Sequence, residues 1–141
     1  MLQFDRMPPI SLLKGANLRD VAARDYDWEF VFDCGVSVVA EGHWRLLDPE
    51  AVVVTDEDHG QSFGLKESVD AASFVRNSVS DATVTAVAFR SPANDLLLSF
   101  SNGWTLEVLI GSGGYENWHV RGPGGSHTFA AGGGGLNHSS G

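Results

Sequence analysis

Two stretches of this chain have nearly the same outline, and they restrict the fold more than any other feature of the sequence. Residues 32–41 read FDCGVSVVAE and residues 100–109 read FSNGWTLEVL. Each stretch places a glycine in a tight turn between two runs of alternating apolar and polar residues, which is typical of half-buried strands. Asn-Gly is a strong hairpin signal because both central residues of the turn adopt positive φ. The sequence therefore predicts two related β-hairpins.

The similarity extends to both sides of each hairpin. Strand-like residues 18–25 and 84–91 precede the two hairpins, and short segments that contain Trp44 and Trp118 follow them. Each half therefore has the pattern strand, strand, tight turn, strand, strand. We interpret the two halves as an internal duplication. The alternative is that any two amphipathic hairpins resemble each other to some extent.

Residues between the two halves predict one more strand and the main helix. The strand is expected at residues 51–55. Apolar residues then follow helical spacing at Leu65, Val69, Ala72, Val75 and Val79. The expected fold class is therefore α+β, with an antiparallel β-sheet of two related β-meanders and one main helix packed on a face.

Composition divides the chain into three segments. Residues 1–15 are rich in turn-forming residues and are expected to form an irregular N-terminal arm. Residues 16–121 are long enough for a single α+β domain with one core. Residues 122–141 contain eight glycines and no Asp, Glu, Lys or Arg. This composition buries too little apolar surface to offset chain entropy, so we expect a disordered Gly-rich tail.

The charge of the chain restricts its partners. The formal net charge is −9, which argues against binding to nucleic acid or to an anionic membrane surface. Residues 25–67 contain eleven acidic and two basic residues, whereas the rest of the chain is neutral. Such a segment can attract a basic protein partner, or it can simply increase solubility.

The sequence also bears on the cellular compartment. Cys34 is the only cysteine, so no intrachain disulfide can form, which fits a reducing environment. The N-terminal residues lack the basic start and the continuous apolar run of a signal peptide or a membrane span. We therefore expect a cytoplasmic protein.

The acidic run Asp56, Glu57 and Asp58 partly fits a calcium-binding loop. Such a loop needs a glycine at its sixth position, and here that position is Gln61. The run is therefore interpreted as a solvated acidic turn whose carboxylates could contact a partner.

Other candidate metal and cofactor motifs are incomplete. The five histidines are not spaced as metal ligands, and residues 111–114 lack the glycine pattern of a dinucleotide-binding loop. The sequence thus predicts no metal site and no cofactor.

A second group of candidate residues combines aromatic rings with carboxylates near the C-terminal half. It consists of Trp104, Glu107, Tyr115, Glu116 and Trp118. Such residues could line a binding pocket, and two glutamates could act as general acid and base. Aromatic residues on alternating strands are more often part of the core. No catalytic constellation is present, so the sequence favours a non-enzymatic protein. The alternative is a small-molecule-binding protein or a weak enzyme that uses this pocket.

Residues 95–120 carry the pattern L-x-x-x-F-x-x-G-x-x-L-E-V followed by G-Y-E-x-W. The matching residues are Leu96, Phe100, Gly103, Leu106, Glu107, Val108, Gly114, Tyr115, Glu116 and Trp118. This signature resembles a family of small bacterial proteins catalogued as a domain of unknown function. The resemblance implies a bacterial origin and a compact β-rich fold, with no assigned activity.

Small acidic bacterial proteins of this general type are associated with immunity against toxins. The first functional hypothesis is therefore a protein-interaction module with a basic partner, and its more specific form is an immunity protein that neutralises a toxin. Short meanders leave sheet edges open for pairing, so both a monomer and a homodimer stay open as alternatives.

Overall fold

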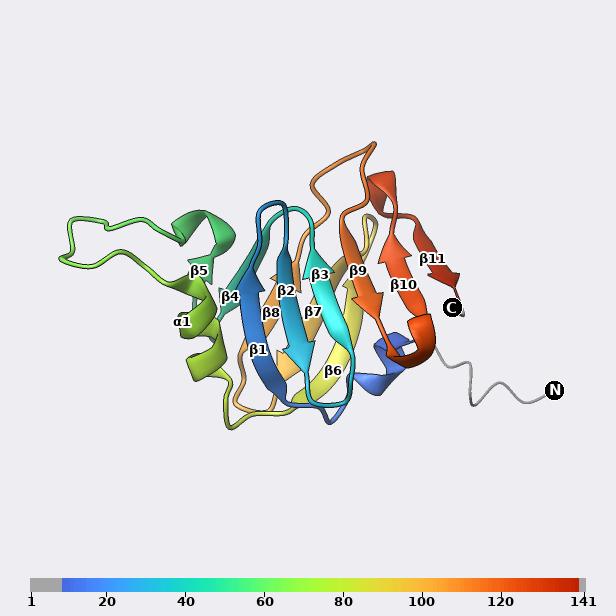
Figure 1. Cartoon of the computed structure of the whole chain (residues 1–141), viewed down its shortest axis with the longest axis horizontal. Helices are drawn as coiled ribbons and strands as arrows, with labels where there is room; N and C mark the ends of the chain where they lie inside the picture. Colours follow the sequence, from blue (N-terminus) through green and yellow to red (C-terminus); the bar gives the residue numbers. More distant parts are fainter. Residues whose placement is uncertain (1–8, 140–141) are drawn as a thin grey trace.

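Two antiparallel β-sheets pack face to face around one hydrophobic core (Figure 1). The computed structural model describes residues 9–139 of the chain. The strands are β1 (Leu18–Ala23), β2 (Trp28–Phe32), β3 (Ser37–Ala40), β4 (Trp44–Leu47), β5 (Val52–Thr55), β6 (Val84–Arg90), β7 (Asp95–Phe100), β8 (Thr105–Val108), β9 (Trp118–Arg121), β10 (His127–Ala130) and β11 (Leu136–Ser139). The helices are α1 (Ala71–Ser78) and the short 3₁₀ helices η2 (Pro9–Leu12), η3 (Asp56–Asp58), η4 (Pro123–Gly125) and η5 (Gly132–Gly134).

The two halves of the chain exchange strands. The first sheet has the order β1-β2-β3-β9-β10-β11 and the second has the order β5-β4-β8-β7-β6. The meanders β1-β2-β3 and β6-β7-β8 are the repeats that the sequence predicts. The fourth strand of each half then leaves its own meander, because β4 pairs with β8 and β9 pairs with β3. Each sheet is therefore built from both halves of the chain.

Details of the turns support the internal duplication. Gly35 and Gly103 both adopt a left-handed backbone, with φ of 83° and 87°, a conformation that favours glycine. A Cβ atom on Gly35 would lie 3.5 Å from Pro123, and one on Gly103 would lie 3.4 Å from Pro49. The β1–β2 and β6–β7 ladders also shift register near equivalent positions. The repeats thus share turn geometry as well as strand pattern.

Aromatic contacts join the two sheets across the core. Trp44 in β4 lies edge-on to Trp28 and Phe30 in β2, with ring centroids 5.0 Å and 5.4 Å apart. Trp118 in β9 stacks on Phe89 in β6 at 5.7 Å. Both tryptophans that the repeat pattern matched are fully buried. Burial of large aromatic side chains contributes strongly to stability, so these rings fix how the sheets pack.

Helix α1 packs against β1 and β5, the strands at one edge of the two sheets. Asp70 begins the helix because its carboxylate accepts a hydrogen bond from the Ser73 backbone N–H at 3.1 Å. Ala71 and Val75 are buried against the core. The α+β class, the antiparallel pairing and the single main helix are confirmed, and the two meanders lie in two sheets rather than one. Within the described residues, no helix is long and apolar enough to cross a membrane.

The C-terminal segment differs from the expected disordered tail. Over residues 122–139 the chain forms β10 and β11, which extend the first sheet beyond β9. Thr128 and Ala130 are buried on the inner side of β10. Glycine raises the entropy cost of ordering this segment, but backbone hydrogen bonds to the adjacent strand β9 offset that cost. Residues 140–141 lie outside the described part of the chain.

The predicted N-terminal arm is also joined to the fold where it is described. Pro9 in η2 and Leu13 are buried, and η2 contacts β9 and β10. Residues 1–8 of the predicted arm lie outside the described residues. The packed domain therefore includes residues before position 16 and after position 121.

Candidate functional site

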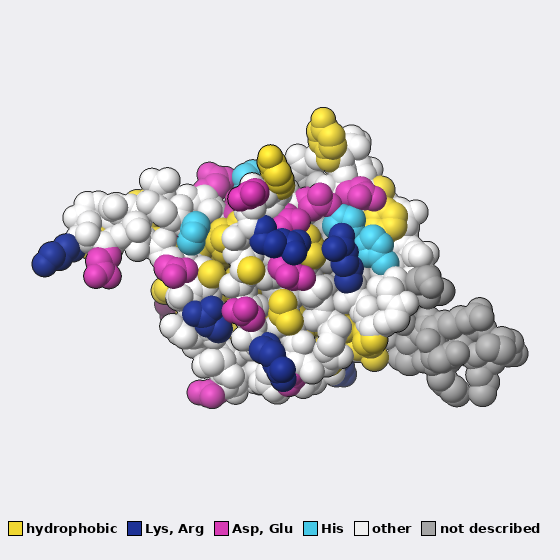
Figure 2. Space-filling view, in the orientation of Figure 1, with side chains coloured by type: hydrophobic (Ala, Val, Ile, Leu, Met, Phe, Trp, Pro, Cys, Tyr) yellow, Lys and Arg dark blue, Asp and Glu magenta, His cyan; other side chains and the backbone are white. Residues whose placement is uncertain are grey.

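Four loops lie together at one end of the sandwich, uppermost in Figure 1, which we call the carboxylate end. They are residues 24–27, 41–43, 56–58 and 109–117. They contain seven acidic residues and one arginine, namely Asp25, Asp27, Glu41, Asp56, Glu57, Asp58, Glu116 and Arg24. Figure 2 shows acidic side chains along this upper edge, with hydrophobic-class side chains projecting there.

The acidic segment that the sequence identified is divided between the two ends of the sandwich. Strand direction reverses at each turn, so Asp33, Asp48 and Glu50 lie in turns at the opposite end. Glu116, which comes from the second half of the chain, also lies at the carboxylate end. The charge concentration of the folded molecule is therefore a product of the topology rather than of one continuous segment.

Two surface hollows flank the 41–43 turn at the carboxylate end. The first, of about 310 Å³, lies between this turn and the 109–117 loop. The second, of about 370 Å³, lies between the same turn and the 24–27 loop. Tyr115 lines the first hollow and Tyr26 lines the second. These tyrosines are the most exposed large hydrophobic residues described, at 82% and 92%.

Asn117 holds the loop that carries Tyr115 and Glu116. Its side chain is buried, and its Oδ1 accepts hydrogen bonds from the backbone N–H groups of Gly111 and Ser112 at 2.9 Å and 3.0 Å. Its Nδ2 donates to the carbonyl oxygens of Ser112, Tyr115 and Ala131. A buried amide that satisfies this many backbone groups gives the loop a defined shape. The loop is thus positioned despite its glycines.

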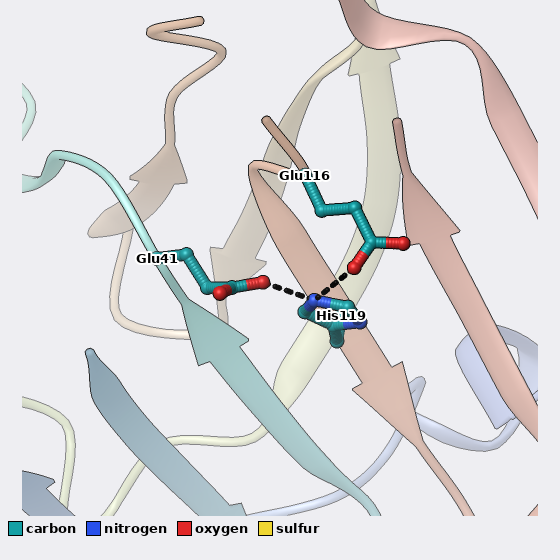
Figure 3. A group of neighbouring side chains, drawn as sticks. All are labelled: Glu41, Glu116 and His119. Atoms are coloured by element: carbon teal, nitrogen blue, oxygen red, sulfur yellow. Dashed lines mark hydrogen bonds and ion pairs between the residues drawn. The ribbon is translucent and has the colours of Figure 1, made fainter. Parts of the chain in front are cut away.

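His119 is the centre of a cluster of titratable side chains (Figure 3). It projects from the outer side of β9, and only 6% of its side chain is exposed. Its Nε2 is hydrogen-bonded to the carboxylate of Glu41 and lies 3.6 Å from Oε1 of Glu116. Its Nδ1 lies 2.6 Å from Nε2 of His127 on the neighbouring strand β10. The three carboxylate and imidazole ligand atoms all lie within 4.8 Å of one another.

A second imidazole–carboxylate pair lies on the other side of the 41–43 turn. Nδ1 of His43 lies 2.8 Å from Oδ2 of Asp56, and Glu57 is 3.6 Å away. Hydrogen bonding to the Asp56 carboxylate, with its negative charge, raises the pKa of His43. The other Asp56 oxygen accepts the backbone N–H of Trp44 at 3.0 Å. Asp56 therefore fixes the start of β4 as well as the imidazole.

The predicted acidic turn is present as η3. Thr55 caps it by accepting the backbone N–H of Glu57 at 3.1 Å, and the Asp58 carboxylate accepts the backbone N–H of Thr55 at 2.9 Å in return. Asp56 is bound by His43, as described above, whereas the side chain of Glu57 is 74% exposed. Of these three predicted residues, Glu57 has the carboxylate most available to a partner.

Glu107 lies away from the carboxylate cluster, on the outer face of the second sheet. Its side chain is 8% exposed and bonds the guanidinium groups of Arg45 at 2.6 Å and Arg90 at 3.2 Å. Arg90 also pairs with Asp95 at 2.7 Å. Hydrogen bonds to Asp95 and Glu107 raise the pKa of Arg90. Glu107 thus belongs to a closed ionic network.

The predicted pocket of five aromatic and acidic residues does not form. Trp118 is fully buried in the core, where its indole N–H donates to the Asn94 carbonyl at 3.1 Å. Trp104 lies near Phe74 of α1, with ring centroids 6.5 Å apart. Of the five predicted residues, only Tyr115 and Glu116 lie at the carboxylate end. Because side chains alternate along a strand, Trp104 and Trp118 pack against the core, whereas Glu107 lies on the outer face of the second sheet.

Sequence reasoning missed Glu41, His119 and Asn117 as a group. The three come together because β3 pairs with β9, and the backbone N–H of Glu41 donates to the Asn117 carbonyl at 3.0 Å. No local pattern reports this pairing between repeats. The match between Trp44 and Trp118 was the one sequence feature that could have indicated the site. These tryptophans begin β4 and β9, so the residues beside them, including His119, occupy equivalent strand starts.

Comparisons of the chain with family models, curated proteins and solved structures gave no match. The resemblance to the bacterial family therefore stays a prediction.

Proposed function

We propose that this chain is a non-enzymatic interaction module that binds a basic segment of a partner protein at the carboxylate end. One observation carries the proposal. Tyr26 and Tyr115, the only two tyrosines of the chain, are both highly exposed at this end, and each lines a hollow beside carboxylates. Exposed aromatic side chains beside charged groups are typical of binding hot spots.

Charge supports a basic partner rather than an acidic one. The four loops of the carboxylate end carry seven acidic residues against one arginine, and Arg24 is already paired with Asp27 at 2.5 Å. A negative surface accelerates association with a cationic partner and repels an anionic one. Tyrosine rings add apolar contact area and can stack on guanidinium groups. The surface therefore suits lysine and arginine side chains.

The opposite end of the sandwich provides an internal contrast. Its turns also carry acidic residues, including Asp33, Glu50 and Asp81, but neither tyrosine lies there. If charge alone determined binding, both ends would attract the same partner. We expect only the carboxylate end to bind tightly, because it combines charge with exposed rings.

The more specific form of the proposal is an immunity protein of the bacterial cytoplasm that blocks a basic toxin by direct contact. The size of the chain, its acidity and its lack of a cysteine framework support this role. The alternative is binding of a small cationic molecule in the first hollow, where Tyr115 and Glu116 lie side by side in the chain. That hollow is open to solvent, and an open site favours a macromolecular surface over a small ligand.

Affinity capture from source lysate, followed by quantitative binding to the captured protein, tests the proposal. We expect one stoichiometric basic partner whose association slows at high salt. Asp25→Asn with Glu57→Gln should weaken binding, as should Tyr26→Ser with Tyr115→Ser. Glu50→Gln with Asp81→Asn removes the same charge from the opposite end and is the matched control. Equal weakening by the control pair, or binding that does not depend on the tyrosines, would contradict the proposal.

A further inference from the structure

We propose that Glu41, Glu116 and His119 form a binding site for one divalent transition-metal cation of the Zn²⁺ class. Both glutamates also belong to the carboxylate end and line its first hollow, but metal binding there does not depend on the proposed function. It uses one imidazole nitrogen and two carboxylates, a ligand set that suits borderline metals better than Mg²⁺ or Ca²⁺.

The geometry brings three ligand atoms to one point. Figure 3 shows the carboxylates of Glu41 and Glu116 directed at the same nitrogen of His119, from different parts of the backbone. Those atoms lie within 4.8 Å of one another, so a cation between them would reach all three after small side-chain rotations. Metal–ligand distances of about 2 Å imply ligand separations of about 3–4 Å, so the carboxylates would close by about 1 Å on binding.

The carboxylates of this cluster lack a fixed counter-charge. Among the described residues, the ion pairs of Glu41 and Glu116 are with His119 alone. One imidazole carries at most one positive charge, and only when protonated. Two neighbouring carboxylates without a guanidinium or ammonium group repel each other. A divalent cation would neutralise both at once.

The second ring nitrogen of His119 is already held. Its Nδ1 lies 2.6 Å from His127 Nε2, and the two rings stack with centroids 4.8 Å apart. Coordination through Nε2 requires the tautomer in which Nδ1 carries the proton, and Nδ1–H then donates to His127. Histidine ligands of metals generally donate their other N–H to an acceptor, usually a carboxylate or a carbonyl, and His127 takes that place here.

The site has both a rigid base and an open side. His119 lies in β9, Glu41 directly follows the paired strand β3, and Asn117 holds the loop of Glu116. Both glutamates line the first hollow, so further coordination positions would face solvent. Three protein ligands with open positions can bind an exchangeable water or a donor from a partner.

Isothermal titration of the untagged full chain with ZnCl₂ tests the proposal. We expect one equivalent to bind, with much weaker responses to MgCl₂ and CaCl₂. Glu41→Gln and Glu116→Gln should each weaken binding by about tenfold or more, and the double variant should abolish it. Glu67→Gln is the matched control, because it removes an exposed carboxylate that lies outside the four loops of the carboxylate end. It should leave the affinity unchanged.

Histidine ¹⁵N spectra provide a second readout that a structural role of the glutamates would not move. Zn²⁺ should shift the Nε2 signal of His119 at one equivalent. Urea midpoints of the glutamine variants, measured without metal, verify that they fold. Three results would overturn the proposal: the absence of stoichiometric Zn²⁺ binding, equal binding of Mg²⁺, or full retention of binding in the double variant.

Discussion

Arg45 and His119 occupy equivalent places in the two repeats, one residue after the matched tryptophans. Arg45 lies opposite Glu107 in the strand ladder, whereas His119 lies opposite Val39. On the second sheet, therefore, a carboxylate is enclosed by two guanidinium groups. On the first sheet an imidazole faces two carboxylates from loops, and neither of these has an arginine partner among the described residues.

The contrast shows where the two repeats have diverged. Their inward residues are apolar in both sheets and form one core, and their turn glycines keep the same backbone conformation. The differences lie on the outer faces. A permanently charged network such as that of Glu107 is structural, because every charge already has its partner. The His119 cluster leaves negative charge available, which is the condition for binding a cation.

The largest expected effect distinguishes the two equivalent tryptophans. Trp118→Phe should lower the free energy of unfolding by about 2–3 kcal/mol, because it leaves a cavity and removes a hydrogen bond to Asn94. Trp44→Phe should cost about 1 kcal/mol less, since its buried Nε1 has no hydrogen-bond partner in the described structure. Urea denaturation of both variants measures the difference. Equal losses would mean that the two indole N–H groups are equivalent.

The next prediction replaces Glu107 of the second sheet by valine, the residue at the equivalent position of the first sheet. Glu107→Val places the equivalent of Val39 opposite Arg45 and leaves Arg45 and Arg90 without this carboxylate. The side chains of both arginines are more than one-third exposed, so water compensates in part. We expect a loss of about 1–3 kcal/mol, measured by urea denaturation.

Glu107→Gln is the control for shape, because it keeps the side-chain volume and one accepting oxygen but removes the charge and the second acceptor. Its loss should be smaller and should depend less on salt. If Glu107→Val were as stable as the wild type, the network would not be structural and the contrast between the two faces would fail.

A third prediction tests the similarity of the repeats rather than their difference. Gly35→Ala and Gly103→Ala each place a side chain at positive φ beside a proline. Both should lower the free energy of unfolding by about 1 kcal/mol, to within about 0.5 kcal/mol of each other. A large loss in only one variant would indicate that the two turns contribute differently to the fold.

The smallest effect concerns α1, which lies at one edge of the sandwich. Hydrogen bonds from the backbone N–H and the hydroxyl of Ser73 lower the pKa of Asp70 in the folded chain. The ionised cap therefore stabilises the fold above the pKa of the unfolded state, and this contribution is lost as the pH falls through the lower folded value. Asp70→Ala should cost about 1 kcal/mol at neutral pH.

Urea denaturation at neutral and strongly acidic pH measures this dependence. The difference between the wild type and Asp70→Ala should narrow in acid, whereas Asp70→Asn should retain most of the cap and respond less to pH. An unchanged difference across this range would show that ionisation of Asp70 does not contribute.

The sequence predicted the strands well because their signals are local. The glycine turns at Gly35 and Gly103, the alternation around them and the matched tryptophans all lie within short stretches. No local sequence pattern predicts that β4 pairs with β8 and β9 pairs with β3. The sequence therefore predicted one sheet, whereas the chain forms two. The strands of residues 127–139 were missed for a related reason, because they depend on pairing with β9 rather than on their own composition.

The same limit applies to the candidate site. Tyr115 and Glu116, two of the candidate residues of the C-terminal half, lie at the carboxylate end. Glu41 belongs to the other half, and only the β3–β9 pairing brings it to His119. Glu107 and Trp118 were grouped with Tyr115 by sequence proximity, although strand alternation separates their side chains. Nearness in sequence thus indicated candidate residues, but not which side chains they contact in the fold.

Amide chemical-shift mapping of the ¹⁵N-labelled chain with a lysine-rich peptide tests the central claim most directly, because both ends of the sandwich carry acidic turns. The account predicts that the largest shifts fall in residues 24–27, 41–43 and 109–117, and that Tyr26→Ser with Tyr115→Ser reduces them. Shifts of equal size in residues 33–36 and 48–51 would contradict it, since they would show that the peptide responds to negative charge alone.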